Sequence, residues 1–270
     1  MTATHSDHLN RSTWTSEAAL REVRSWAGFT DPGEKAALEA IADEVRGQPI
    51  LDLGVGAGRT VPLLRGLSEE YTALDYLPEM VELCSRAHPG VRVIHGDARD
   101  LSQFASGSFK LVSFSFNGLD AVEHGDRQRI LAEVFRVLRP GGIFFFSTFN
   151  QEGPSYDEKP WVPRVDFSHP VRMVRSGLRW LGSLPVELNN WRARRHLNVR
   201  GPDWSLMLGV AHHYGLLIHF TTLAEERREL ERVGFAPDPT VFECRQGQRV
   251  LPGADVSRSW WFHLLARKPV

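Results

Sequence analysis

The sequence predicts an α/β fold: a doubly wound, mostly parallel seven-stranded sheet with a helical cap insertion. Between residues 48 and 150, short apolar segments alternate with amphipathic helical segments, which is the pattern of successive βαβ units. After Asn150 this alternation stops for about 65 residues, and proline recurs there six times before Thr221. Unstructured loops of that length are uncommon inside a compact domain, so we expect a small helical insertion there.

Composition and charge restrict the class of protein. The 270 residues are 42% hydrophobic and 24% charged, which is typical of a packed globular chain. A formal net charge of -1 gives no overall attraction to nucleic acid or to a membrane surface. The sequence shows neither an apolar signal segment nor a membrane-spanning apolar run, so we expect a cytoplasmic protein. Cys84 and Cys244 lie far apart in sequence and are interpreted as buried free thiols, with no metal site.

The predicted elements follow the chain in order. A helical leader and lid covers residues 1–47, with helical sequence from Glu17 to Val45 broken at Asp31-Pro32-Gly33. The core, residues 48–150, has predicted strands at 49–54, 71–75, 91–95, 109–116 and 141–149, with helices between them. The cap covers residues 151–215. Residues 216–270 complete the core with a helix at 221–235 and a hairpin-like pair of strands at 239–244 and 257–268.

The strongest functional signal is a glycine-rich turn after the first strand. Asp52 is followed by Gly54, Gly56 and Gly58, which together give a GxGxG spacing at a strand-to-helix junction. Glycines there allow the backbone to approach a ligand closely. The spacing differs from the GxGxxG of dinucleotide folds, and a purely structural turn is the alternative interpretation.

Two acidic residues follow the next two predicted strands. Asp75 ends the second strand, where a carboxylate can accept hydrogen bonds from ribose hydroxyls, and Asp97 follows the third strand. Each acid alone fits a helix cap or a solvated loop. Because the carboxyl ends of parallel strands meet at one edge of a sheet, the turn and both acids predict a nucleotide-type site there.

The segments ILDLGVGAGRT, ALDYLPEMVELC, GDARDL, FKLVSFSFNGLDAV and LRPGGIFFFSTFN resemble class I S-adenosylmethionine-dependent methyltransferases. The resemblance covers about residues 48–150 and, more weakly, 220–267. It implies a Rossmann-like fold, S-adenosyl-L-methionine as cofactor, and methyl transfer by direct displacement. It also implies cofactor contacts, in order along the chain, by Asp52, Gly54, Gly56, Gly58, Asp75, Tyr76, Met80, Asp97, Ala98, Ser115, Phe116 and Asn117.

The resemblance implies that Asp52 and the glycines lie beside the methionine part of the cofactor, and that Asp75 holds the ribose. Tyr76 and Met80 flank the adenine, while Asp97 and Ala98 hold its edge. The residues that end the fourth strand, Ser115, Phe116 and Asn117, face the sulfonium.

Candidates for the acceptor side come from histidine-containing segments. His124 follows the fourth strand and is one candidate general base, because imidazole suits deprotonation of a hydroxyl near neutral pH. His213 is the second candidate base, and we expect Asn150, His212 and Tyr214 to contact the substrate. A solvated helix start for His124 and a packing role for the other histidines are the alternatives.

The insertion is both cationic and aromatic. Residues 151–200 contain nine basic and five acidic side chains, interleaved with tryptophans. This composition suits a lid for an acidic or aromatic substrate, or a surface that rests on an anionic membrane. A cap with solvated arginines and a tryptophan core is the alternative, and no nucleic-acid partner is expected.

The sequence thus predicts a methyltransferase for a small molecule, with O-methylation in a specialised-metabolite or glycolipid pathway as the leading hypothesis. The alternatives are N- or C-methylation, a cofactor-binding protein without transfer activity, and a nicotinamide-dependent oxidoreductase that uses Asp75 for its ribose. The sequence defines neither the acceptor nor the oligomeric state.

Overall fold

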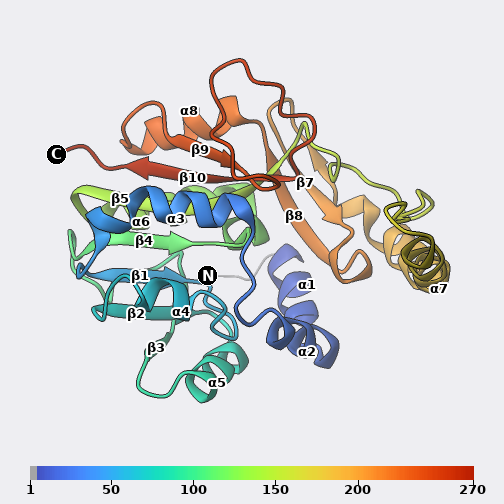
Figure 1. The fold of residues 1–270 in the computed structure, drawn as a ribbon, viewed down its shortest axis with the longest axis horizontal. Coiled ribbons are helices and arrows are strands. Elements are labelled where there is room, and N and C mark those ends of the chain that lie inside the picture. Colours follow the sequence, from blue (N-terminus) through green and yellow to red (C-terminus); the bar gives the residue numbers. More distant parts are fainter. Residues whose placement is uncertain (1–4) are drawn as a thin grey trace.

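A central sheet organises the computed structural model, which describes residues 5–270 (Figure 1). Its core has seven strands in the order β3-β2-β1-β4-β5-β10-β9, which confirms the predicted fold class. All neighbours are parallel except β10, which runs antiparallel to both β5 and β9. The strands are β1 (Ile50–Leu53), β2 (Tyr71–Asp75), β3 (Arg92–His95), β4 (Phe109–Phe114), β5 (Leu138–Asn150), β9 (Thr240–Glu243) and β10 (Trp261–Arg267).

Helices cover both faces of this sheet, as the doubly wound prediction requires. One apolar cluster joins α3 (Pro32–Val45), α4 (Val61–Arg65) and α5 (Pro78–Ala87) to one face. A second cluster joins α6 (His124–Val137) and α8 (Leu223–Val233) to the other face. Neighbouring residues of β5 divide between them, since Phe144 belongs to the second cluster and Phe145 to the first. This alternation explains why a covered strand is apolar throughout.

The region after β5 differs from the predicted helical cap. It holds the long helix α7 (Pro170–Arg194) and the 3-10 turns η2 (Arg195–Leu197) and η3 (Ala211–His213), but also three strands. These are β6 (Val199–Arg200), β7 (Trp204–Gly209) and β8 (Leu216–Thr221). These three strands are antiparallel to one another. They extend the sheet, because β8 pairs in parallel with the last two residues of β5. The cap is therefore only partly helical. The sequence analysis missed its strands because short apolar runs such as Leu206–Leu208 do not distinguish strand from helix by their pattern.

The leader crosses the sheet at the carboxyl ends of its parallel strands. It begins with α1 (His5–Trp14) and α2 (Glu17–Ser25), which lie together at that end (Figure 1). Asn10 fixes α1 through hydrogen bonds from its amide to the carbonyl oxygens of Ala121, 2.7 Å, and Leu217, 2.9 Å. Ala121 ends the 3-10 turn η1 (Gly118–Ala121), which follows β4. Helix α1 precedes the helical sequence predicted from Glu17, while residues 1–4 of the predicted leader lie outside the described residues.

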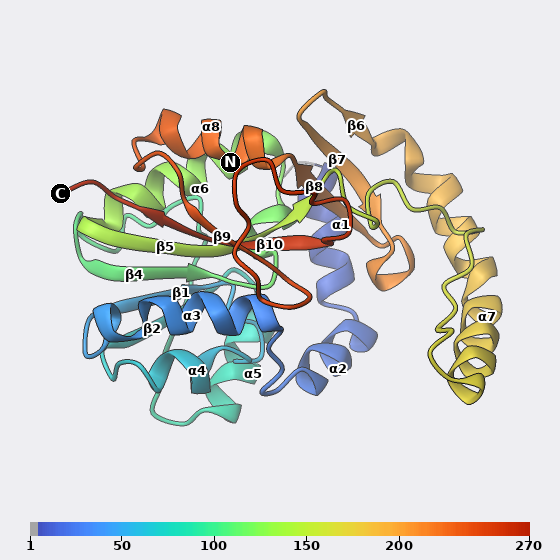
Figure 2. The same ribbon diagram turned by 45° about the horizontal axis from the view of Figure 1, so that its top comes forward.

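The longest helix stands apart from the core. Helix α7 projects beyond β7 and β8, at the far side of the molecule from α4 and β2 (Figure 2). No helix in residues 5–270 combines the length and the apolar character needed to cross a membrane.

Candidate active site

A cleft lies where the carboxyl ends of β1, β2 and β4 meet the leader. It consists of two adjoining cavities, both of which are lined by Gly54, Tyr76, Phe114, Gly118 and Ala121. The first cavity extends under α1 and α2, and the second extends toward the end of β3. The topology thus brings the predicted strand-end signals to one place.

The glycine turn forms one wall of the first cavity. Gly54 has φ +62°, and a Cβ atom there would lie 2.6 Å from the Phe114 ring, so the position requires glycine. Gly56 also lines the cavity, and its N–H donates to Asp75 Oδ2 at 2.9 Å. Gly58 is a correction to the sequence-based expectation, because it does not line the cavity. A Cβ atom on Gly58 would instead lie 2.4 Å from the His88 ring, so this glycine serves close packing.

Asp52 lies under the glycine turn and fixes its shape. It is 1% exposed and accepts hydrogen bonds from the hydroxyls of Thr60 and of Tyr71, the latter at 2.7 Å. Burial raises the pKa of Asp52 to about 6, although these hydrogen bonds act in the opposite direction. Asp52 lines the first cavity and ties β1 to the start of α4.

Asp75 is placed to bind hydroxyl groups. Its carboxylate accepts the N–H groups of Gly56 and Leu77, each at 2.9 Å, and burial raises its pKa to about 6. An ionised carboxylate has about four acceptor positions, so about two remain for a ligand in the cavity that it lines. Tyr76 and Met80 line the same cavity.

The second cavity contains the other predicted pair, Asp97 and Ala98. Beside them, Arg99 donates to both oxygens of Asp97, and its Nη1 lies 2.7 Å from a carboxylate oxygen of Asp7 and of Asp126. Because Asp7 is on α1 and Asp126 is on α6, Arg99 holds the leader over this end of the cleft.

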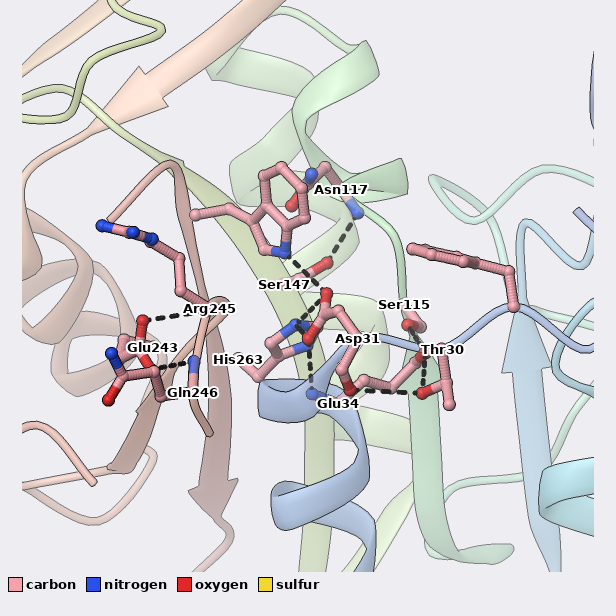
Figure 3. Close-up of polar contacts among 12 residues, drawn as sticks. Thr30, Asp31, Glu34, Ser115, Asn117, Ser147, Glu243, Arg245, Gln246 and His263 are labelled. Atoms are coloured by element: carbon pink, nitrogen blue, oxygen red, sulfur yellow. Dashed lines mark hydrogen bonds and ion pairs between the residues drawn. The ribbon is translucent and has the colours of Figure 1, made fainter. Parts of the chain in front are cut away.

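The turn after β4 adopts an unusual backbone at the centre of the cleft. Phe116 and Asn117 have φ +57° and +59°, which is rare for a residue as bulky as phenylalanine. The Asn117 N–H donates to Ser147 Oγ at 2.6 Å, as Figure 3 shows. Within the described chain, Asn117 Oδ1 has no hydrogen-bond partner, although the residue is only 9% exposed and lines the first cavity. This side-chain amide oxygen is therefore available to a ligand.

A buried ion pair, which the sequence analysis missed, closes the far end of the first cavity. Arg59 directly follows the glycine turn and makes two hydrogen bonds to Glu34, at 2.6 and 2.8 Å. Burial alone would raise the pKa of Glu34, but Arg59 reverses this and holds that pKa below its usual value. Arg59 also donates to Ser115 Oγ at 3.0 Å. The Ser115 hydroxyl donates to Glu34, as Figure 3 shows. The position of Arg59 after the glycines was its one sequence signal.

The position of Glu34 depends on the start of α3. Asp31 caps this helix by accepting the Glu34 N–H at 2.9 Å, and its other oxygen lies 2.9 Å from His263 Nε2. Trp261 donates to the same Asp31 oxygen at 2.9 Å. These contacts tie α3 to β10 and so hold Glu34 beside Ser115, as Figure 3 shows.

Aromatic side chains of the leader and of the turn after β4 also line the first cavity. Trp14 ends α1, Trp26 follows α2, and both line the cavity with Phe116. The Trp26 and Phe116 rings meet edge to face with centroids 5.0 Å apart, and Arg59 Cζ lies 4.9 Å from the Phe116 centroid. The sequence analysis missed both leader tryptophans, whose only signal is their presence in a polar segment.

The two predicted bases lie outside the cleft. His124 is in a separate hollow, where it stacks on Trp204 with centroids 4.1 Å apart and lies 3.3 Å from His219 Nε2. His213 is 56% exposed and lies 3.2 Å from a carboxylate oxygen of Glu187 on α7. Neither histidine lines either cavity, which corrects the expectation that one of them acts beside the cofactor.

The three predicted substrate residues also make other contacts. The amide of Asn150 donates to the carbonyl oxygens of Val256, 2.9 Å, and Ser259, 3.0 Å. Tyr214 is fully buried in an apolar cluster of the cap, while His212 packs edge to face against Trp14 with centroids 4.8 Å apart. None of these three lines the cleft, because Asn150 ends β5, and His212 and Tyr214 lie in the connection between β7 and β8.

This site and this fold define a class of protein, an α/β protein that binds an adenosine-containing ligand at the carboxyl ends of parallel strands. A sequence model described as a methyltransferase domain matches residues 50–142, the segment that supplies the glycine turn and all three strand-end acids. The chain belongs to the class I S-adenosylmethionine-dependent methyltransferases. S-adenosyl-L-methionine is the cofactor of this family.

Curated relatives support this assignment. The chain is 32% identical over 185 residues to a ubiquinone biosynthesis O-methyltransferase of Xanthomonas oryzae pv. oryzae, covering 58% of this chain and 73% of the relative. It is 30% identical over 114 residues to a probable S-adenosylmethionine-dependent methyltransferase of Mycolicibacterium smegmatis. That match covers only 42% of each chain, so this chain spans about two fifths of the mycobacterial relative.

A solved structure shares the fold. The 1,6-didemethyltoxoflavin-N1-methyltransferase of Burkholderia thailandensis, with 1,6-didemethyltoxoflavin and S-adenosylhomocysteine bound, is 19% identical with a TM-score of 0.52. The match covers 97% of this chain and 84% of that one. At this identity, the likeness concerns the arrangement of helices and strands.

Proposed function

We propose that this chain transfers a methyl group from S-adenosylmethionine to an oxygen atom of a small molecule in a specialised-metabolite or glycolipid pathway. The observation that carries the proposal is the first cavity, which runs from Asp75 and the glycine turn to the aromatic residues Trp14 and Trp26. Two leader helices cover that cavity, and its aromatic side suits a small apolar or planar acceptor.

The residues of the cleft fit the cofactor. Asp75 offers carboxylate positions for the ribose hydroxyls, and Gly54 and Gly56 leave space where a Cβ atom would intrude or face the cavity. Asp97 and Ala98 line the adjoining cavity, where the adenine edge would lie. The unpartnered Asn117 Oδ1 points to a hydrogen-bonding group of the ligand or acceptor beside β4.

Bound S-adenosylmethionine supplies a methyl group on a positively charged sulfur, which becomes a neutral thioether when an acceptor atom takes the methyl. The protein therefore has to align the acceptor and exclude water. Trp14, Trp26 and Phe116 exclude water at the leader side, and Asn117 Oδ1 can accept a hydrogen bond that orients the acceptor.

The ionisable groups of the cleft favour an acidic acceptor. No histidine of residues 6–270 lines either cavity, while Asp52 and Asp75 are engaged on the cofactor side. A carboxylate or an acidic phenol is ionised near neutral pH and needs no base to lose a proton. We therefore propose such an oxygen as the methyl acceptor.

The relatives offer one chemical alternative. The Xanthomonas relative is named as an O-methyltransferase, which supports oxygen, whereas the Burkholderia enzyme is named as an N1-methyltransferase. Transfer to a ring nitrogen of a planar heterocycle is the second candidate function, favoured by the aromatic Trp26–Phe116 pair, whose centroids are 5.0 Å apart.

The first test is titration calorimetry with S-adenosylmethionine, S-adenosylhomocysteine and NADH. We expect micromolar binding of the two methionine-derived ligands and its loss in Asp75→Ala. Turnover is then screened with aromatic carboxylic acids and acidic phenols, with planar N-heterocycles as the competing set. Methylation of the heterocycles alone would replace oxygen by nitrogen, and binding without any turnover would favour a protein that has lost transfer.

A further inference from the structure

Helix α7 carries an apolar face that the rest of the described chain leaves uncovered. Val171, Val174, Leu178 and Leu181 follow one another at spacings of three and four residues, so they lie on one side of the helix. Their exposed fractions are between 55% and 67%. Phe167, just before the helix, is 79% exposed. Exposed apolar side chains gathered on one face mark an interaction surface rather than a random surface.

The opposite face of α7 attaches the helix to the cap. Glu187 is the one buried residue of α7, and it pairs there with Arg164. The Trp180 indole donates to the carbonyl oxygen of Pro160 at 3.0 Å, and Trp191 meets Trp161 edge to face. The helix is thus held on one side, while the residues of the apolar stripe remain exposed. Figure 2 shows α7 projecting away from the core.

A row of positive charge runs beside the apolar stripe. Arg172, Arg175 and Arg179 repeat at the same spacing, shifted by one position, and all three are exposed. Between Asp166 and Glu187 the sequence contains no acidic residue. A helix with an exposed apolar stripe and a flanking arginine row is typical of segments that lie in the surface of an anionic membrane.

Charge also distinguishes between possible occupants of this face. In an antiparallel two-fold pair that buries the two stripes against each other, both arginine rows would lie on the same side, and six arginines would come close together without a counter-charge from α7 between residues 171 and 186. The phosphate groups of an anionic bilayer supply that counter-charge, and its acyl boundary accepts the valine and leucine side chains. A helix of this composition lies on a bilayer and does not cross it, in agreement with its lack of spanning character.

We propose that the α7 face formed by Val171, Val174, Leu178, Leu181 and the three arginines docks onto an anionic phospholipid membrane. Because α7 and the leader lie on the same side of the core sheet, docking would bring the cleft toward the bilayer (Figure 1). The docking of the α7 face does not depend on which acceptor the cleft binds.

The test is co-sedimentation of the full chain with vesicles of phosphatidylcholine, with or without phosphatidylglycerol. We expect binding only to the vesicles that contain phosphatidylglycerol, weakened by salt. Arg172→Gln, Arg175→Gln and Arg179→Gln together should weaken binding about 100-fold, since each basic residue near such a surface contributes about 1 kcal/mol. The pair Leu178→Glu and Leu181→Glu should weaken it at least about tenfold through the lost apolar contact.

Matched controls lie in the segment before β10. Leu251→Glu changes a leucine that is 63% exposed, and Arg258→Gln changes an exposed arginine, both away from α7. These variants should bind vesicles like the parent chain. S-adenosylhomocysteine binding, measured on every variant, shows that each is folded, and sedimentation needs no turnover, so failure of the acceptor hypothesis would leave this test intact.

Three results would overturn the proposal. The first is equal binding of the parent chain and the α7 variants to anionic vesicles, and the second is no binding of the parent chain at all. The third is a dimer, seen by sedimentation velocity without vesicles, that Leu178→Glu dissociates, because a second copy would then cover the stripe.

Discussion

The two ends of the cleft are built from different kinds of chain segment. At the cofactor end, Asp52, Asp75 and Asp97 lie in or directly after parallel strands, whose hydrogen-bonded registers place them side by side. At the proposed acceptor end, Trp14 and Trp26 come from the leader, which is held over the cleft by the contacts of α1 with η1 and β8 and by Arg99. The first end inherits its geometry from the sheet, whereas the second depends on a few long-range contacts, so the two ends should respond differently to substitution.

The largest effect is expected at the buried pair of Arg59 and Glu34, which closes the far end of the first cavity. Arg59→Met leaves the Glu34 carboxylate, 1% exposed, without its counter-ion, which should lower the free energy of unfolding by about 3 to 5 kcal/mol. Urea denaturation measures this loss. The double variant Glu34→Gln with Arg59→Met should recover a large part of it, and equal stabilities of parent and single variant would show that the pair is not buried in solution.

Loss of the Asp75 carboxylate, which we propose binds the ribose hydroxyls, should affect the cofactor end alone. Asp75→Asn removes a charged acceptor, and hydrogen bonds to charged groups contribute about 1.5 to 3 kcal/mol each, so S-adenosylhomocysteine should bind at least about 100-fold more weakly. Calorimetry gives the affinity. Asp100→Asn, a fully exposed acid near the same edge, is the matched control and should leave binding unchanged. Similar losses in both variants would contradict a specific role for Asp75.

Loosening the leader should instead affect the acceptor end. Asn10→Ala leaves the Leu217 N–H and carbonyl groups without their side-chain partner, at a cost of about 1 to 3 kcal/mol in the docking of α1. Limited proteolysis should then cut the leader about tenfold faster or more. Ser12→Ala, on the exposed side of α1, serves as the control. An unchanged cleavage rate in Asn10→Ala would show that other contacts hold the helix.

Cofactor binding should weaken in mild acid. Burial raises the pKa of Asp75 to about 6, so below that pH the folded chain carries a neutral carboxyl that accepts ribose hydroxyls less strongly. The affinity for S-adenosylhomocysteine should fall by up to about tenfold per pH unit below pH 6. Calorimetry from pH 5 to 8 measures this affinity. If the affinity of Asp75→Asn falls with pH in the same way, a group other than Asp75 takes up the proton.

The raised pKa values of Asp52 and Asp75 also make the stability of the fold depend on pH. Between the ordinary aspartate pKa of 3.8 and about 6, the folded chain holds more protons at Asp52 and Asp75 than the unfolded chain. The contribution of these two carboxyls to stability therefore falls as the pH rises through that interval.

The smallest effects are expected at the histidines outside the cleft. His124→Ala and His213→Ala should each leave turnover within about twofold, since neither residue lines a cavity and an ionised acceptor needs no base. Steady-state assays with the acceptor found by screening provide the measurement. A large fall in kcat with unchanged cofactor affinity, for either variant, would return that histidine to the mechanism.

The sequence by itself determined the sheet and the cofactor end. Alternating apolar and amphipathic segments specify βαβ units, and the direction of parallel strands then forces Asp75 and Asp97 to one edge. Gly58 shows an ambiguity of the glycine pattern: we predicted a cofactor contact, but a positive φ can also serve close packing, and a Cβ atom there would meet His88. A glycine pattern alone cannot distinguish the two.

Only the tertiary structure decided the acceptor end. The contacts that bring Trp14 to the cleft join Asn10 to residues 111 and 207 positions away, and local sequence patterns carry no record of such distances. Conversely, Asn150 and Tyr214 looked suitable by residue type, but Asn150 ends β5 and Tyr214 lies in the connection between β7 and β8, and both make hydrogen bonds outside the cleft. Side chains after parallel strands are positioned by short-range periodicity, whereas those on docked helices are positioned by packing between distant segments, which forms only when the chain folds.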